Sequence, residues 1–166
     1  IDDSADRLES LIGNLLDMSR LQVGALVAHP RLTDLGEIVP AAIIGSAATG
    51  RVTWTLGEGA RYAEADPGLL DRVLSNLVEN AMRHHDDPAK IRVTTSRIRD
   101  EVQLRVIDSG PGIPEVMRES AFQPFQRHTD SGGSGVGLGL AVARGLAEAM
   151  GGTLTAEETP GGGLTM

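Results

Sequence analysis

Residues 132–140 read Gly-Gly-Ser-Gly-Val-Gly-Leu-Gly-Leu, and an apolar helical pattern follows them directly. The pattern predicts a helix from about Gly137 to Met150, so the glycines lead into its first turn. Successive backbone N–H groups at a helix N-terminus favour an anion, which makes phosphate a natural ligand. A flexible loop would carry the same glycines, so this stretch needs support from elsewhere in the chain.

Glycine is concentrated in the same part of the sequence. The chain has 166 residues and 21 glycines, and 13 of these glycines lie from Gly110 onward. They follow no fixed period and apolar patterns separate them, which excludes a collagen or a low-complexity linker. Glycines confined to turns between regular elements indicate that the backbone approaches a ligand closely.

A second stretch, Asp108-Ser109-Gly110-Pro111-Gly112-Ile113, follows a strand predicted over 101–107. These residue types are common in tight turns, and a plain turn would account for them. A carboxylate at the end of a strand can also accept a hydrogen bond from the amino group of adenine. The two glycines would let the backbone approach a flat base.

A third stretch lies on a helix predicted over 67–85. Asn76, Asn80 and Arg83 are spaced i, i+4 and i+7 along one margin of its apolar face. Asparagine is unfavourable inside helices, so two in register need a reason. Exposed amides would give the same spacing, but amide oxygens also suit Mg²⁺, which is commonly shared with phosphates. The neighbouring pair at 84–85 points its rings apart and predicts no shared metal site.

The other patterns predict helices mixed with antiparallel hairpins, an order that favours an α+β sandwich with helices on one face of the sheet. Between Asp34, a candidate cap, and residue 48 we expect a helix that Pro40 kinks or delays. The remaining expected elements are a helix over 2–23, a strand at 32–33, a hairpin of strands 52–56 and 61–65, a second hairpin of strands 90–98 and 101–107, a short helix over 114–120, and strands over 153–158 and 163–166.

Composition excludes several classes of function. Lys and Arg number 15 against 23 Asp and Glu, a net charge of −8, which argues against a general nucleic-acid or anionic-membrane surface. There is no cysteine for disulfides, thiolate metal sites or nucleophilic catalysis. No apolar run is long enough to span a membrane. The single lysine, Lys90, does not follow a glycine, so the P-loop motif is absent, and so are the motifs of the protein-kinase fold.

The first helix leaves two interpretations open. Its apolar stripe over 2–23 is wide for a lone surface helix, so it packs on its own domain or forms one arm of a helical hairpin or dimer. The chain starts at Ile1 and stops at Met166 soon after an apolar alternation begins. We therefore expect a piece of a longer protein, with its last strand truncated.

Together, the order and spacing of these motifs are specific. Asn76-x-x-x-Asn80, Asp108-x-Gly110-x-Gly112, Phe122-x-x-Phe125 and Gly135-x-Gly137-x-Gly139 resemble the N, G1, F and G2 boxes of bacterial sensor histidine kinases. These kinases share an ATPase superfamily with Hsp90, DNA gyrase B and MutL. The resemblance covers nearly the whole chain, and 135–152 and 157–166 look most like the potassium-responsive Kdp-type sensor kinases.

The fold that this resemblance implies is the Bergerat ATP-binding fold, a two-layer α/β sandwich with a mixed sheet on about three helices. One N-terminal helix would precede it. Residues 1–26 would be a remnant of the second dimerisation and phosphotransfer helix, and 27–166 the ATP-binding catalytic domain.

The resemblance also implies roles for individual residues. Asn80 would bind Mg²⁺, with Asn76 beside it and Arg83 reaching the phosphates, while Asp108 would accept from adenine and His84 would lie beside the nucleotide. Phe122 and Phe125 would anchor the base of a lid over about 127–136. The further nucleotide-contacting residues would be Gly110, Gly112, Ile113, Phe125, Arg127, Gly135, Val136, Gly137, Leu138, Gly139 and Leu140.

The implied activity is transfer of the ATP γ-phosphoryl group to a histidine that lies outside this sequence, and onward to a response regulator. The resemblance further implies a cytoplasmic, soluble domain of a homodimeric, membrane-anchored kinase. The acidic net charge adds the expectation that it binds no nucleic acid. An ATPase or serine kinase of the same superfamily, such as an anti-sigma-factor kinase or an Hsp90-like machine, is an alternative, as is a nucleotide-binding interaction module. Asn76 stands where hydrolysing members carry a glutamate, which disfavours an ATPase.

Overall fold

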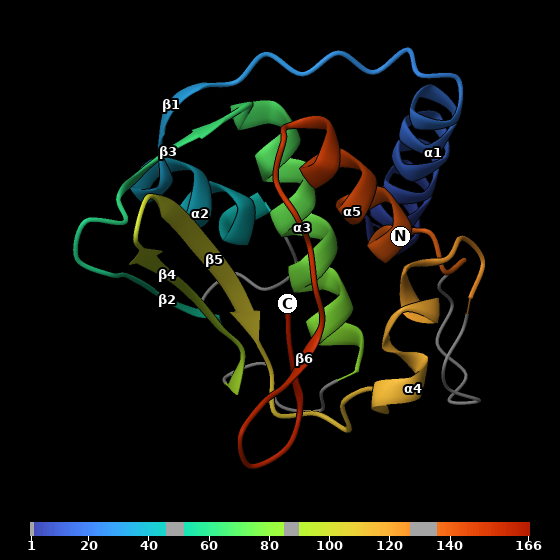
Figure 1. The fold of residues 1–166 in the computed structure, drawn as a ribbon. Coiled ribbons are helices and arrows are strands. Elements are labelled where there is room, and N and C mark those ends of the chain that lie inside the picture. The colour runs from blue at the N-terminus through green and yellow to red at the C-terminus, as the bar shows by residue number, and fades with distance from the viewer. Residues whose placement is uncertain (1, 46–51, 85–89, 127–135) are drawn as a thin grey trace.

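The computed structural model describes residues 2–45, 52–84, 90–126 and 136–166, and its main layer is a five-stranded sheet in the order β2-β4-β5-β7-β6 (Figure 1). Strand β2 runs parallel to β4, and the other neighbours are antiparallel. The five strands are β2 (Thr53–Leu56), β4 (Arg92–Ile98), β5 (Glu101–Ile107), β6 (Glu157–Glu158) and β7 (Leu164–Thr165). A separate two-stranded sheet pairs β1 (Arg31–Asp34) with β3 (Tyr62–Ala65).

Helices form the second layer, as Figure 1 shows. The central helix α3 and its neighbours α2 and α5 cover one face of the large sheet, so the predicted α+β sandwich with a mixed sheet is confirmed. Within the described residues the helices are α1 (Asp2–Gln22), α2 (Leu35–Gly45), α3 (Pro67–Arg83), α4 (Glu115–Arg118), the 3₁₀ turn η2 (Ser120–Phe122) and α5 (Gly139–Ala149). Within the part of the chain that the structure describes, no helix is long and apolar enough to cross a membrane.

The core forms where α3 and α5 meet above the sheet. The first turn of α3 is capped by Asp66, whose Oδ1 accepts from the N–H groups of Gly68 and Leu69, and Pro67 occupies its first position. Leu74 and Val78 are fully buried on the apolar stripe that the sequence predicts. This packing fixes the polar margin of α3 against the start of α5, which is where the candidate site lies.

One predicted pairing is wrong. The strands over 52–56 and 61–65 do not form a hairpin, because β2 pairs in parallel with β4 and β3 pairs with β1. After β2 the chain stays on β4, where the Gly57 N–H donates to the Thr95 carbonyl oxygen. Arg61 then makes a bidentate ion pair with Asp34 at the end of β1, beside the pairing of β3 with β1. These partners are distant in sequence, so local alternation did not reveal them.

The structure also decides where α2 begins and moves the start of α5. Helix α2 runs through Pro40 from Leu35, with Asp34 accepting from the Gly36 N–H, so the helix has no late start. Helix α5 begins at Gly139 rather than Gly137, because Gly137 has φ of 75°, outside the right-handed helical region. Residues 153–156, predicted as strand, are irregular, and only 157–158 pair.

Helix α1 packs on α5 along one side, as Figure 1 shows. A Cβ atom on Gly145 would lie 2.6 Å from Leu21 Cδ1, so the absence of a side chain at Gly145 lets α1 pack closely on α5. The opposite side of α1 exposes large apolar side chains, namely those of Leu8, Ile12, Leu15 and Leu16. The domain therefore buries only part of the apolar stripe of α1.

Candidate functional site

The site is built around the carboxylate of Asp108, which is only 6% exposed at the end of β5. Its Oδ1 accepts two backbone hydrogen bonds, from Gly110 N at 2.8 Å and from Leu164 N at 3.1 Å. Among the described residues, no hydrogen bond goes to Oδ2. One oxygen is therefore fixed by the protein, and the other is available as an acceptor in a defined direction.

Glycines let three segments approach each other around Asp108. A Cβ atom on Gly110 would lie 2.8 Å from the carbonyl oxygen of His84. Gly112 has φ of 70°, and a Cβ there would lie 2.9 Å from the carbonyl oxygen of Gly163. Gly163, with φ of 113°, would place a Cβ only 2.1 Å from the Asp108 carbonyl oxygen. Gly110 and Gly112, in the turn after Asp108, and Gly163, just before β7, thus let the backbones of these segments pack directly against one another.

The sequence did not single out Gly163 as a site residue, because 161–163 look like a plain turn before the last strand. That interpretation is wrong for Gly163, which packs directly on Asp108 and Ser109. The next residue, Leu164, donates the second hydrogen bond to the carboxylate. The sequence signal available for this contact was a run of three glycines before an apolar residue, but such a run does not indicate which segment it packs against.

Gly163→Ala is expected to destabilise the domain by about 3 kcal/mol. The new methyl group would overlap the backbone of Asp108, and alanine would have to adopt the positive φ of residue 163. Gly161→Ala is the matched control. Gly161 has φ of 93°, but no atom lies within 4 Å of its Cβ position. Urea unfolding of both variants measures the difference. Equal losses of stability would show that the close packing of Gly163 contributes nothing.

The amide side chains of α3 lie beside the start of α5. Asn76 is buried, and its Oδ1 lies 3.3 Å from the position of a Cβ on Gly139. Asn80 is half-buried one turn further along, and Arg83 is exposed at the end of the helix. No hydrogen bond joins either amide side chain to another residue in the described ranges. The helix and the glycine stretch that the sequence singled out therefore meet in space.

His84 caps α3 and borders the Asp108 turn through its carbonyl oxygen. Much of the residue is exposed, yet partial burial of the ring lowers its pKa below the ordinary value of 6.5. The positive charge of Arg83 lowers the pKa further, and the carboxylate of Asp108 opposes both effects. The imidazole is therefore neutral at neutral pH.

The two phenylalanines have different surroundings. Phe122 is buried in the domain, whereas Phe125 is 64% exposed and has φ of 64°, a strained conformation for a residue other than glycine. The N–H of Phe125 donates to the carbonyl oxygen of Gly137 at 2.9 Å. A Cβ on Gly137 would lie 2.6 Å from the Gln126 carbonyl oxygen. This contact brings the phenylalanine segment to the start of α5.

The other sequence-predicted site residues divide into three groups. Leu138 is buried, so only its backbone remains for a ligand. Ile113, Val136 and Leu140 are half-buried. Arg127 and Gly135 lie outside the described residues, as does most of the predicted lid.

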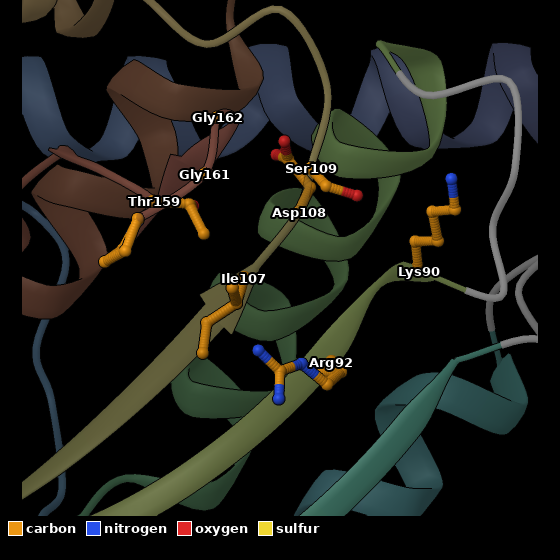
Figure 2. A pocket seen from close by; sticks show the side chains of 9 residues that line it. Lys90, Arg92, Ile107, Asp108, Ser109, Thr159, Gly161 and Gly162 are labelled. Carbon is orange, nitrogen blue, oxygen red and sulfur yellow. The ribbon is translucent and has the colours of Figure 1, made fainter.

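Behind the strand that carries Asp108, the outer face of the sheet has a separate hollow of about 290 Å³. Figure 2 shows Lys90 and Arg92 on one side of it and the turn with Gly161 and Gly162 on the other. The amide row of α3 does not line this hollow. The candidate site and the hollow therefore differ in their lining, although Asp108 borders both.

Comparison with known proteins places this arrangement in a family. The family model described as histidine kinase-, DNA gyrase B-, and HSP90-like ATPase matches residues 65–166. Sensor protein KdpD of Mycobacterium tuberculosis (strain CDC 1551 / Oshkosh) is 47% identical over 176 residues, which cover 100% of this chain and 20% of that protein. The chain thus spans about a fifth of the length of this curated relative.

Solved structures of histidine kinases are similar in fold. Full-length ShkA in complex with AMPPNP matches with a TM-score of 0.78 and 26% identity, covering 98% of this chain and 35% of that one. The catalytic domain of histidine kinase ThkA matches with a TM-score of 0.68 and 26% identity, covering 82% of this chain and 91% of that one. The chain therefore belongs to the family of histidine kinase-, DNA gyrase B- and HSP90-like ATPases, and its form is that of a sensor-kinase catalytic domain.

Proposed function

We propose that this domain binds ATP with Mg²⁺ and transfers the γ-phosphoryl group to a histidine on a separate helix. The observation that carries the proposal is the carboxylate of Asp108, with Oδ1 held by two backbone N–H groups and no described hydrogen bond to Oδ2. An acceptor oriented in this way matches the exocyclic amino group of adenine. Family membership and the AMPPNP bound to ShkA support a nucleotide as the ligand.

The residues on α3 fit a magnesium ion that arrives with phosphates. Asn80 would hold the ion through its amide oxygen, with Asn76 beside it, and neither amide has a described hydrogen-bond partner. A neutral amide suits an ion whose charge is balanced by phosphate oxygens, and Mg²⁺ prefers oxygen ligands. When bound, the ion would neutralise the charge that develops on the phosphates.

The start of α5 would hold the phosphates. Gly137 and Gly139 keep the backbone free of side chains beside Asn76 and Phe125. The N-terminal N–H groups of an eleven-residue helix point toward this end and favour anions. Arg83 would add a positive charge from α3, and the neutral ring of His84 would lie against the nucleotide.

The reaction itself is a displacement at phosphorus. A histidine nitrogen forms a bond to the γ-phosphorus while the bond to the β–γ bridging oxygen breaks, and ADP leaves. The domain contributes position and charge stabilisation rather than a covalent intermediate. Asn76 stands where a hydrolase of the superfamily would carry a carboxylate to activate water, and this favours transfer over hydrolysis.

We further propose that the histidine is carried by a dimerisation helix of the whole protein and that a response regulator receives the phosphoryl group next. Residues 1–26 would then be the second helix of that dimerisation hairpin, with 27–166 as the catalytic domain. The exposed side chains of Leu8, Ile12, Leu15 and Leu16 support this division, because they leave an apolar face for helical partners. A membrane-anchored, homodimeric kinase with this domain in the cytoplasm is the corresponding whole protein.

Asn80→Ala is expected to weaken ATP binding in the presence of Mg²⁺ by about 10- to 100-fold, the effect of losing one ligand to a charged group. Isothermal titration with and without Mg²⁺ measures the effect. Glu79→Gln is the matched control, since Glu79 is adjacent on α3 but its Oε2 accepts from Ser10 of α1. If the affinity for ATP is the same with and without Mg²⁺ and the same in the wild type and in Asn80→Ala, the role of Asn80 as a metal ligand is refuted.

A further inference from the structure

Arg144, in the middle of α5, lies where three segments of the domain meet. Its guanidinium carbon is 3.6 Å from the centroid of the Phe122 ring, and both terminal nitrogens form an ion pair with the carboxylate of Glu119. Its Nε donates to the Leu154 carbonyl oxygen at 3.3 Å. The side chain is 20% exposed, so these contacts use nearly the whole group.

Only arginine can make this set of contacts at once. The planar guanidinium presents two parallel N–H groups to the carboxylate, stacks on the aromatic ring, and still has Nε free for the carbonyl oxygen. A lysine ammonium would keep the charge but would lose the bidentate geometry and the flat stacking surface. The contacts therefore specify the position of Glu119 and Phe122 relative to α5, rather than merely neutralising a charge.

The segment fixed in this way continues directly into the candidate site. Three residues after the buried Phe122 comes the strained Phe125, whose N–H donates to Gly137. Gly137 lies two residues before Gly139, the first residue of α5, and Arg144 lies within that helix. The segment is thus held at two points, at Phe122 by Arg144 of α5 and at Phe125 by Gly137 in the loop that leads into α5.

We propose that Arg144 is a positioning residue for the triphosphate end of the bound nucleotide, an inference that rests on the proposed function. It touches no nucleotide itself, and it acts by holding residues 119–125 against α5 so that Phe125 and Gly137 keep their mutual geometry. The base end of the site depends on Asp108, which Gly110 and Leu164 fix independently of Arg144. Loss of Arg144 should therefore affect phosphate binding and leave base binding intact.

The test compares affinities for ATP and for adenosine, each with Mg²⁺, in the wild type and in Arg144→Met. We expect the dissociation constant for ATP to rise about tenfold and that for adenosine to change less than about twofold. Arg144→Lys should not restore ATP affinity, because charge alone is insufficient. Arg105→Met is the matched control, since Arg105 lies on β5 and, within the described residues, its side chain donates only to Gln103.

Binding of ATP by the wild type tests the proposed function separately, so a failure there is distinguishable from a failure of this inference. Equal weakening of ATP and adenosine in Arg144→Met would overturn the positioning role and indicate general destabilisation. Unchanged ATP affinity, or full rescue by Arg144→Lys, would overturn it as well. If Arg144→Met does not fold, Glu119→Gln tests the same contact. We then expect a smaller loss of affinity for ATP and no loss of affinity for adenosine. Unchanged ATP affinity, or equal losses for ATP and adenosine, would contradict the inference.

Discussion

Asp108→Asn is expected to weaken ATP binding by about 30- to 100-fold, the effect of leaving a buried polar group mispaired. The amide oxygen of asparagine can still accept from Gly110 and Leu164, so the turn is retained. In place of Oδ2 the variant presents an N–H₂ group, which faces the amino group of adenine donor to donor. Guanine carries an acceptor oxygen at that position, so the affinity for GTP should fall much less or rise.

Titration of both nucleotides against the wild type and the variant measures this change in preference. Asp100→Asn, an exposed substitution at the opposite end of β5, is the control that should change neither affinity. Equal losses for ATP and GTP would show that Asp108 only stabilises the turn. Unchanged ATP affinity would refute its assignment as the adenine acceptor.

Arg72→Met is expected to lower the free energy of unfolding by about 3 kcal/mol at neutral pH. Arg72 Nη2 on α3 lies 2.5 Å from Asp17 Oδ2 on α1, and Asp17 is only 2% exposed. This oxygen accepts no hydrogen bond within the described residues, so the arginine charge is its compensation. This loss lies at the lower end of the range for a broken buried ion pair because 39% of the Arg72 side chain is exposed.

The pH dependence of this effect identifies its cause. Burial raises the pKa of Asp17 above its ordinary value of 3.8, while the charges of Arg72 and Arg20 lower it, and burial is the larger effect. Without Arg72 the pKa of Asp17 should rise further. Asp17 in the native state of the variant then binds a proton more tightly than it does in the unfolded state. The loss of unfolding free energy caused by Arg72→Met therefore shrinks as the pH falls toward 3.8.

Urea unfolding of wild type and Arg72→Met at several pH values checks this expectation. Asp17→Asn combined with Arg72→Met should recover most of the lost stability at neutral pH, since no buried charge remains. A penalty independent of pH, or a double variant as unstable as Arg72→Met, would show that the loss comes from packing rather than from the buried carboxylate.

The sequence predicted those parts of the fold that depend on local periodicity. Helix α3 matched closely, because its cap at Asp66, Pro67 at its first position and its apolar spacing all lie within one segment. The β4–β5 hairpin was predicted for the same reason, with its turn at Arg99 and Asp100. The pairing of β2 with β4 was missed because parallel neighbours come from distant segments whose local patterns do not identify a partner.

The candidate site divides in the same way. Asn76, Asp108 and Gly110 were singled out because their motifs have characteristic spacing, and the structure brings their segments close together. Gly163 and Arg144 were missed because their partners lie 55 and 22 residues away, at Asp108 and Phe122, and a single glycine or arginine carries no local signal of such a contact.

Transfer to histidine is tested most directly by supplying the acceptor in trans. The domain is mixed with a helical hairpin that carries the phospho-accepting histidine of its kinase, in the presence of Mg²⁺ and ATP labelled at the γ-phosphate. We expect acid-labile label on the hairpin with the wild-type domain and none with Asn80→Ala. Release of free phosphate without labelled hairpin, or binding of ATP without any transfer, would contradict the assignment of this domain as a histidine kinase.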